Sequence, residues 1–382
     1  MELVSTLELQ QQIVRLQALL KVGHHIHSTI QLDSVLRSVL QITVRELEMG
    51  GAFFTAFPFS HGEIPPGFLL HPPSSNPKRG CFRFPLLDHE GKMLTEMVVI
   101  TRNGAPLSLY EQDFLENLAI QAAVAIENAR YHEQMLDMAR VKQDLASARD
   151  IQRSLLPQSI PSVPGYSIAG RSQTCYEVGG DYLDVIPLPS GELMMVVADV
   201  AGKGLTSALV GSSFRSAFRA MANSPMPLAE MAARMNALHY GEGEESRRRY
   251  VTAMFLRLDA EKHALEVVNA GHNPGFLLQG GKDAVLIGAS GTPVGMLPFS
   301  SYSAEKYVFE KKDRLLLYTD GMTEVFHEDE EFGQDRLLQS FRACRDSDAN
   351  AVLDALWQAV GAFSTEESQS DDMTALVLQR HA

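Results

Sequence analysis

Four short acidic turns in the C-terminal half constrain this chain more than any other feature. They read Gly179-Gly180-Asp181, Ala198-Asp199-Val200, Thr319-Asp320-Gly321 and Ser370-Asp371-Asp372. Three of them adjoin apolar runs with the composition of β-strands, at residues 193–198, 314–319 and 373–378. We therefore expect strand ends to bring carboxylates from distant parts of the chain to one point. Carboxylates held that close raise one another's pKa, so the pattern predicts a site for hard divalent cations such as Mg2+ or Mn2+.

The order of these turns resembles that of the metal-dependent protein phosphatase (PPM) family, in its bacterial SpoIIE-like branch. The resemblance covers roughly residues 150–380 and also rests on Glu177-Val178-Gly179-Gly180-Asp181, Ala270-Gly271-His272-Asn273-Pro274 and Thr319-Asp320-Gly321-Met322-Thr323-Glu324. Each turn alone is a weak signal, because an Asp beside Gly is more often a turn residue than a ligand. The resemblance implies an α-β-β-α sandwich of two antiparallel sheets over residues 158–382, with two divalent metal ions, Mn2+ or Mg2+, at one edge.

The same resemblance implies roles for individual residues. Asp199 would bridge both metals, and the backbone carbonyl of Val200 would lie beside it on the first. Asp181 would reach the first metal directly or through water. Asp320 and Asp371 would complete the second metal. In the family, a hydroxide held between the metals, here at Asp199 and Asp320, attacks phosphorus without forming a phosphoenzyme.

Further residues are expected around this metal site. Asp372 would steady the loop or exchange roles with Asp371, and Asp184 is expected at a sheet-edge turn. Gly202 and Gly204 would allow the backbone to approach closely. Lys203 lies between them at the start of a helix and could attract phosphate, or it could simply face solvent.

The proton donor to the leaving group is not fixed by the sequence. Many eukaryotic members of the family carry a His two residues after the bridging Asp, and here Ala201 stands in that place. Water is one alternative and His272 is another. His272 could instead cap backbone groups in the tight turn 270–274.

Residues 22–131 are predicted to form a second α/β unit. Helical periodicity over residues 34–46 is followed by strand-like runs at 51–57, 81–87 and 92–101, and Ser108 to Glu111 form a capping box that opens a further helix. The segments 30–36 and 122–129 make this unit similar to a GAF domain. That resemblance implies a regulatory sensor, but the ligand is unknown, and its apolar residues are better explained as core than as a pocket.

Two helical segments outside these units carry apolar stripes. Residues 1–21 form an expected N-terminal helix, and the predicted linker 132–157 continues the last GAF helix because no Pro or Gly interrupts residues 108–155. Such stripes predict a parallel homodimer joined by coiled coils, with a passive spacer as the alternative reading of the linker. The stripe residues are Leu9, Ile13, Leu16 and Leu20 in the first helix, and Met138, Val141, Leu145, Ala148, Ile151 and Leu155 in the linker.

Composition excludes several other classes of function. A formal charge of −14 argues against a nucleic-acid partner, and the basic run 247–249 reads as a solvated loop or as a contact for a phosphoprotein. We expect no membrane span and no secretory signal, and hence a cytoplasmic protein. The separated Cys81, Cys175 and Cys344 predict neither a disulfide nor a metal site. His24, His25 and His27 lack a matching cluster and are not expected to bind metal.

These patterns together predict a metal-dependent serine/threonine phosphoprotein phosphatase regulated by its GAF domain. By resemblance, its substrate is a small anti-sigma factor antagonist phosphorylated on Ser or Thr, in a bacterial partner-switching pathway. The alternatives are a non-catalytic signalling scaffold and a GAF small-molecule sensor with a vestigial phosphatase domain. The retained set of carboxylates argues against the scaffold.

Overall fold

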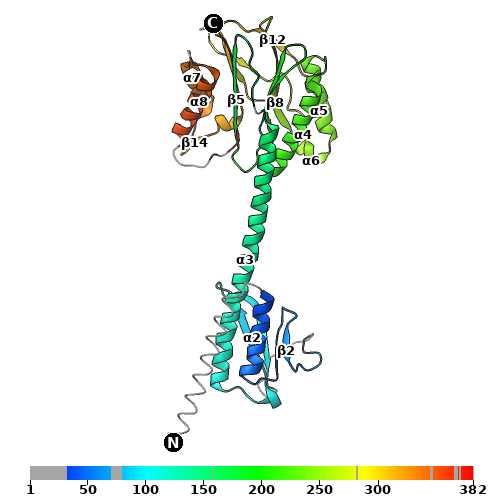
Figure 1. The fold of residues 1–382 in the computed structure, drawn as a ribbon, viewed down its shortest axis with the longest axis vertical. Coiled ribbons are helices and arrows are strands. Elements are labelled where there is room, and N and C mark those ends of the chain that lie inside the picture. The colour runs from blue at the N-terminus through cyan, green and yellow to red at the C-terminus, as the bar shows by residue number, and fades with distance from the viewer. Residues whose placement is uncertain are drawn as a thin grey trace. The chain divides into compact units, whose positions relative to one another are not determined.

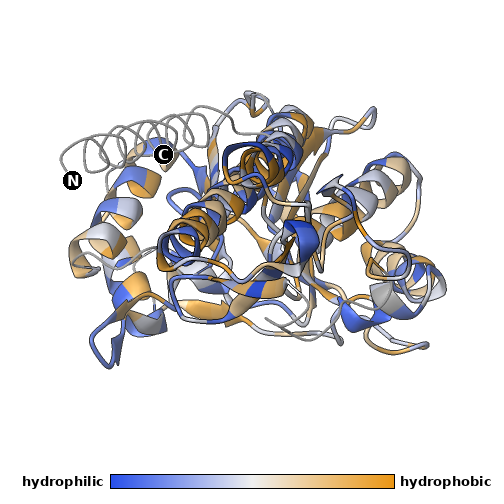
Figure 2. Cartoon of the chain, turned by 90° about the horizontal axis from the view of Figure 1, so that it is seen from below, coloured by the Kyte–Doolittle hydropathy of each residue, from blue (hydrophilic) through white to orange (hydrophobic). Residues whose placement is uncertain are grey.

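The computed structural model describes residues 32–69, 80–157, 159–280, 283–344, 347–364, 369 and 371–381. Contacts divide the chain into two compact units, Met1–Val141 and Lys142–Ala382. The predicted N-terminal helix over residues 1–21 and the histidines at 24, 25 and 27 lie outside the described residues. Within the described residues, no helix is long and apolar enough to cross a membrane. Figure 2 accordingly shows the coloured helices as mixtures of hydrophobic and hydrophilic residues.

The first unit is built on a four-stranded antiparallel sheet in the order β2-β1-β4-β3. One core unites this sheet with helix α2 and the first turns of helix α3. The predicted strands at 81–87 and 92–101 are confirmed, β1 is shorter than predicted, and β2 was not predicted. The elements are α2 (Leu32–Glu46), β1 (Gly51–Phe54), β2 (Ser60–Gly62), β3 (Cys81–Leu87), β4 (Met93–Ile100) and α3 (Leu109–Leu155).

Helix α3 is continuous over 47 residues, as the lack of Pro and Gly predicted. The capping box at its start is confirmed: the Glu111 backbone N–H donates to Ser108 Oγ at 3.2 Å, and the Ser108 N–H donates to Glu111 Oε2 at 2.8 Å. Apolar side chains of its C-terminal half are exposed, at 71% for Met138, 58% for Val141 and 63% for Ile151. A second helix packed on this stripe remains a prediction.

The second unit contains two five-stranded sheets. The first sheet has the order β11-β10-β13-β16-β5, the second sheet has the order β12-β9-β8-β7-β6, and all their strand pairs are antiparallel. The strands are β5 (Tyr166–Gln173), β6 (Tyr182–Pro187), β7 (Leu193–Val200), β8 (Val251–Asp259), β9 (Ala264–Ala270), β10 (Gly275–Leu278), β11 (Val285–Ile287), β12 (Glu305–Val308), β13 (Arg314–Tyr318) and β16 (Met373–Arg380).

Alternation along strand β7 shows how the layers are assembled. Leu193, Met195 and Val197 join the core between the two sheets. The intervening Met194 and Val196 pack with helices α4 (Leu205–Ala222) and α5 (Leu228–Gly241) on the outer face. Helices α7 (Gly333–Ala343) and α8 (Ala349–Phe363) cover the outer face of the first sheet (Figure 1). The predicted sandwich of two antiparallel sheets between helices is therefore confirmed.

Several elements of the second unit were not predicted. Strands β5 and β6 carry polar residues among their apolar ones, which hides the strand pattern. The run 247–249, which lies partly in the short helix α6 (Glu244–Arg248), was read as a loop or a substrate contact. Helix α7, strands β11 and β12, and the two-residue strands β14 (Phe326–His327) and β15 (Glu330–Glu331) were not predicted. The run 247–249 is thus partly helical and not a plain loop.

Candidate metal centre

The second sheet brings two of the predicted carboxylates together. Asp181 directly precedes β6, and Asp199 is the penultimate residue of β7. These strands run antiparallel with Tyr182 opposite Ala198, so the start of one lies beside the end of the other. The carbonyl of Val200 faces the same turn, because a Cβ on Gly180 would stand 3.0 Å from it.

The first sheet repeats this arrangement with strands β13 and β16. Tyr318 lies opposite Ala375, so Asp320 after β13 and Asp371 before β16 are neighbours. A hydrogen bond joins the two sheets at this edge, because Thr319 Oγ1 donates to Asp181 Oδ2 at 2.8 Å. We call this edge, with its four aspartates, the metal edge.

The carboxylates at the metal edge raise one another's pKa. Burial and the charges of Asp320 and Asp371 raise the pKa of Asp199 to about 7. Burial and the charge of Asp199 hold the pKa of Asp181 well above its ordinary range. Hydrogen bonds from Thr374 and Thr319 oppose this shift. Burial and Asp371 also raise the pKa of Asp320. This is the electrostatic state expected of ligands without their cation.

A lysine supplies the positive charge that reaches this cluster. Lys203 Nζ lies 2.9 Å from Asp371 Oδ2, and this hydrogen bond raises the pKa of Lys203. In the described ranges, no three His, Cys, Asp or Glu side chains stand close enough together to hold an ion. The donors at this edge are nevertheless all oxygens, and burial and neighbouring carboxylates raise the pKa of Asp181, Asp199 and Asp320, so this chemistry fits a hard divalent cation.

Asp372 holds the turn that leads to Asp181. It accepts hydrogen bonds from the backbone N–H groups of Cys175 and Gly180, both at 2.7 Å. A Cβ on Gly179 would stand 2.3 Å from Asp372 Oδ2, so only glycine fits there. The geometry favours the first of the two predicted roles of Asp372, in which it steadies the loop.

Glycines shape the connection between Asp199 and helix α4. Gly202 and Gly204 have φ angles of +101° and +77°, which residues other than glycine rarely adopt. Their predicted backbone role agrees with these angles. Lys203 between them faces Asp371 and not solvent alone.

The prediction that Asp184 lies at a sheet-edge turn is wrong. Asp184 is inside β6 and fully buried. Arg219 of α4 donates to it from Nε at 2.6 Å and from Nη2 at 2.9 Å, and the Tyr182 hydroxyl donates a third hydrogen bond. The sequence concealed this role because the neutralising arginine lies 35 positions away, on a helix that packs over the strand.

His272 is buried behind the metal edge. Burial lowers its pKa to about 4, so the imidazole is neutral at pH 7. Its Nδ1 lies 2.9 Å from Thr252 Oγ1, and that hydroxyl lies 3.4 Å from the Asp199 carbonyl. Asn269, which sequence reasoning did not single out, caps the turn by accepting from the His272 N–H at 2.7 Å. Asn269 therefore makes the cap of this turn, and the His272 ring contacts the Thr252 hydroxyl.

The end of helix α3 contacts the turn before Asp181, which the sequence did not predict. Gln152 Nε2 donates to the Gly179 carbonyl at 2.7 Å, and its Oε1 accepts from the Gly179 N–H at 3.2 Å. Arg149 Nε donates to the Glu177 carbonyl at 2.8 Å. Two side chains within one turn of the helix therefore hold the backbone that positions Asp181.

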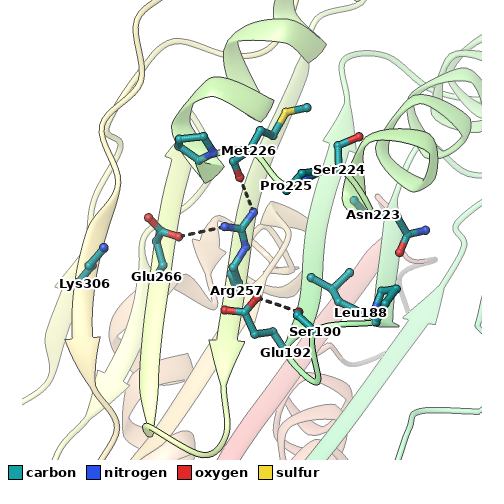
Figure 3. A pocket seen from close by; sticks show the side chains of 13 residues that line it. Leu188, Ser190, Glu192, Asn223, Ser224, Pro225, Met226, Arg257, Glu266 and Lys306 are labelled. Atoms are coloured by element: carbon teal, nitrogen blue, oxygen red, sulfur yellow. Dashed lines mark hydrogen bonds and ion pairs between the residues drawn. The ribbon is translucent and has the colours of Figure 1, made fainter.

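A pocket of about 570 Å3 lies at the other end of the second sheet (Figure 3). It is formed by the β6–β7 hairpin, the α4–α5 connection and side chains of β8, β9 and β12, among them Arg257, Glu266 and Lys306. None of the predicted site residues lines it. We call this the pocket end.

Comparison with known proteins identifies relatives of this chain. The model of the family Stage II sporulation protein E (SpoIIE) matches residues 189–381. Protein IcfG of Synechocystis sp. is 26% identical over 264 residues, which is 62% of this chain and 42% of IcfG. Phosphoserine phosphatase RsbP of Bacillus subtilis is 28% identical over 183 residues, which is 47% of this chain and 45% of RsbP. The chain thus spans less than half of the length of either relative.

Phosphoserine phosphatase RsbU of Bacillus subtilis is 23% identical over 272 residues, or 70% of this chain and 78% of RsbU. Among solved structures, the RsbU and RsbW domains of Rv1364c from Mycobacterium tuberculosis align with a TM-score of 0.51 at 26% identity, covering 60% of this chain and 63% of that one. The SiaA-PP2C domain of Pseudomonas aeruginosa aligns with a TM-score of 0.56 at 19% identity, covering 64% and 99%. The two-sheet unit therefore has a PP2C-like fold.

Proposed function

This chain belongs to the SpoIIE family, and from that membership we propose that it is a protein serine/threonine phosphatase that depends on divalent metal ions. The observation that carries the proposal is the metal edge. Four aspartates at four strand ends lie along this one edge, and the pKa values of three of them are raised by burial and by neighbouring carboxylates. If these aspartates served only the fold, we would expect lysine or arginine side chains beside each of them, because an unpaired buried charge is destabilising.

The ligand roles follow the arrangement of strand ends. Asp181, Asp199 and the Val200 carbonyl would hold one cation, and Asp199, Asp320 and Asp371 would hold the second. When bound, two such ions lower the pKa of water and neutralise charge on a phosphoryl group, which promotes hydrolysis of a phosphate ester. Manganese and magnesium are the ions that this donor set would take.

Other residues of the chain would bind and orient the substrate. The Lys203 ammonium sits on Asp371, so a phosphoryl group that enters the site meets a positive charge at its rim. His272 would position Asp199 through Thr252 and would not donate a proton. Water would then protonate the seryl or threonyl oxygen that leaves.

The substrate class is inferred from the family. RsbU and RsbP are both named phosphoserine phosphatases. We therefore propose a phosphoserine or phosphothreonine protein as substrate, namely a small anti-sigma factor antagonist in a bacterial partner-switching pathway. An acidic chain with a charge of −14 suits a protein substrate better than a nucleic acid.

Hydrolysis assays of the full chain test this proposal. We expect turnover of p-nitrophenyl phosphate and of a phosphoserine peptide with Mn2+ or Mg2+, and loss of turnover in EDTA. Turnover that survives EDTA would contradict the metal role. No turnover of either substrate with either ion would leave the non-catalytic scaffold as the better explanation.

We also propose that residues 22–131 are a GAF-like sensor, with an unidentified ligand, that acts on the metal edge through the helical linker 132–157. Two observations support this coupling. Gln152 and Arg149 at the end of α3 hold the turn before Asp181. The exposed apolar residues further up the helix would be covered in a parallel homodimer.

Insertions into α3 test the coupling. One residue inserted after Ala148 rotates everything before it by about 100° relative to Gln152, whereas seven residues make nearly two full turns and restore the stripe. We expect the single insertion to change basal phosphatase activity severalfold or more and the seven-residue insertion to restore most of it. A monomer at micromolar concentration in light scattering, or no effect of either insertion, would reduce the linker to a tether.

A further inference from the structure

We infer that Arg249 recognises the anionic part of the phosphorylated substrate. Its guanidinium group would donate hydrogen bonds to an oxygen of the phosphoryl group, or to an acidic side chain next to the phosphorylated residue. This inference rests on the proposed phosphatase function and adds a residue that contacts the substrate. It comes from a contrast within the basic run 247–249.

Two of the three arginine side chains have partners within the chain. Arg247 lies over the ring of Tyr240, 4.3 Å from its centroid, and donates from Nε to the Tyr240 carbonyl at 3.0 Å. Arg248 pairs with Glu244 at 2.8 Å, one helical turn earlier in α6. Within the described part of the chain, the Arg249 side chain makes no hydrogen bond or ion pair, and its Nε is buried without an acceptor.

The backbone places Arg249 beside the metal edge. The next residue, Tyr250, accepts a hydrogen bond through its carbonyl from the Ala201 N–H at 2.9 Å. A Cβ on Gly202 would stand 2.5 Å from Nη1 of Arg249. The guanidinium group therefore lies directly against the loop that follows Asp199, which is the predicted bridging ligand.

The chemistry of this position suits an oxyanion. Acidic partners are abundant in the chain, with 47 Asp and Glu against 33 Lys and Arg, yet no described one is placed against Arg249. The end of the guanidinium group, whose Nη1 lies against Gly202, has no described acceptor and can donate to a bound oxygen. A planar guanidinium fork matches the geometry of phosphate and carboxylate oxygens better than an ammonium does.

Three variants of the full chain test the inference. Arg249→Gln removes the charge, Arg249→Lys keeps the charge without the fork, and Arg248→Gln is a matched control on the same segment. Each is assayed on p-nitrophenyl phosphate, on a phosphoserine peptide flanked by Asp and Glu, and on the same peptide flanked by Ala. Thermal unfolding midpoints show which variants are folded.

We expect Arg249→Gln to lower kcat/KM by about ten- to a hundredfold, the loss typical of a charge-assisted hydrogen bond, with partial recovery in Arg249→Lys. A loss on all three substrates would assign the contact to the phosphoryl group. A loss confined to the acid-flanked peptide would assign it to a neighbouring carboxylate. The exposed Arg248→Gln control should stay within about twofold of the parent protein.

Two results would overturn the inference while leaving the phosphatase function intact. Arg249→Gln could match the parent on all three substrates, or Arg248→Gln could lose as much as Arg249→Gln. If Arg249→Gln does not fold, the test depends on Arg249→Lys. An unchanged KM in that variant, which lacks the guanidinium fork, would contradict a contact between Arg249 and the substrate. Absence of metal-dependent turnover in the parent protein would instead refute the phosphatase proposal itself.

Discussion

The two ends of the second sheet treat charge in opposite ways. At the pocket end, Arg257 donates to the Met226 carbonyl at 2.8 Å and lies 3.7 Å from Glu266, while Glu192 accepts from Ser190 (Figure 3). At the metal edge, carboxylates lie against other carboxylates. The same strands could have carried lysine or arginine side chains beside the acidic groups at both ends. At the metal edge Lys203 pairs with Asp371, but the other three aspartates of that edge keep pKa values raised by burial and neighbouring carboxylates. This arrangement fits a cation that is not part of the chain.

The same contrast exists within three residues of strand β6 and its leading turn. Asp184 is buried and receives four hydrogen bonds, two of them from Arg219. Asp181 is also buried, but its described side-chain donors are uncharged threonine hydroxyls, and Asp199 raises its pKa. Burial alone therefore does not distinguish a structural acid from a ligand. Between these two acids the difference is the partner, because Arg219 pairs with Asp184 and the described side-chain donors to Asp181 are uncharged.

The largest expected effect comes from removing a ligand charge at the metal edge. Asp199→Asn or Asp320→Asn should abolish Mn2+-dependent hydrolysis, a loss of at least about a thousandfold, because each removes a charged oxygen without changing side-chain volume. Glu266→Gln, the matched change at the pocket end, should leave hydrolysis unchanged. Activity within about tenfold of the parent in both Asp variants would refute the two-metal assignment.

The next effect separates the two acids of the β6 segment. Asp184→Asn should lower the free energy of unfolding by about 2–3 kcal/mol, because it leaves Arg219 without its charged partner in a half-exposed site. Asp181→Asn should lose activity without that loss of stability. Chemical denaturation of both variants in EDTA, with activity measured in Mn2+, would distinguish them. Equal destabilisation by the two changes would show that the distinction between paired and unpaired acids is wrong.

The central strands of the sandwich could be predicted because they are apolar on both faces, whereas the two-sheet arrangement itself was implied by the family resemblance. Strand β7 is buried along almost its whole length and reads as a continuous apolar run. Strand β5 reads Tyr-Ser-Ile-Ala-Gly-Arg-Ser-Gln and is partly exposed, so its sequence resembles a connection. Edge strands and short helices depend on what packs against them, and that information is not local in the sequence.

The candidate ligands could be recognised because their motifs are local in the sequence. Their supporting contacts could not be predicted, because they are not local. Each candidate ligand belongs to a short contiguous motif at a strand end. The supporting contacts join residues far apart in the chain: Thr319 to Asp181 over 138 positions, and Gln152 to Gly179 over 27. Such pairs arise from the packing of sheets and helices, which a single sequence does not specify residue by residue.

A smaller effect concerns the stability of the metal-free protein. Without metal the pKa of Asp199 is about 7, above its ordinary value of 3.8. Its contribution to stability is therefore present below pH 3.8 and is lost as the pH rises toward about 7. In EDTA at pH 7.5, Asp199→Asn should unfold at a temperature higher by roughly 2–4 °C for each kcal/mol of relieved repulsion.

The two proteins should unfold at similar temperatures near pH 4.5, where Asp199 is protonated. Added Mn2+ should stabilise the parent protein more than the variant at pH 7.5, because the ion binds only the folded carboxylates. Glu266→Gln at the pocket end should show no such dependence on pH or metal. A metal-free parent that is more stable than Asp199→Asn at pH 7.5 would contradict the repulsion on which the comparison depends.

The smallest expected effect concerns His272, which lies behind the metal edge without belonging to it. With a pKa of about 4, only about one imidazole in a thousand is protonated at pH 7, too few for an efficient proton donor. His272→Gln should therefore cost less than about threefold on p-nitrophenyl phosphate, whose leaving group is good, and little more on a phosphoserine peptide. Any loss should be equal on the two substrates, because it would reflect a small shift of Asp199 through Thr252. A loss of about a hundredfold on the peptide alone would instead make His272 the acid and extend the metal edge to include it.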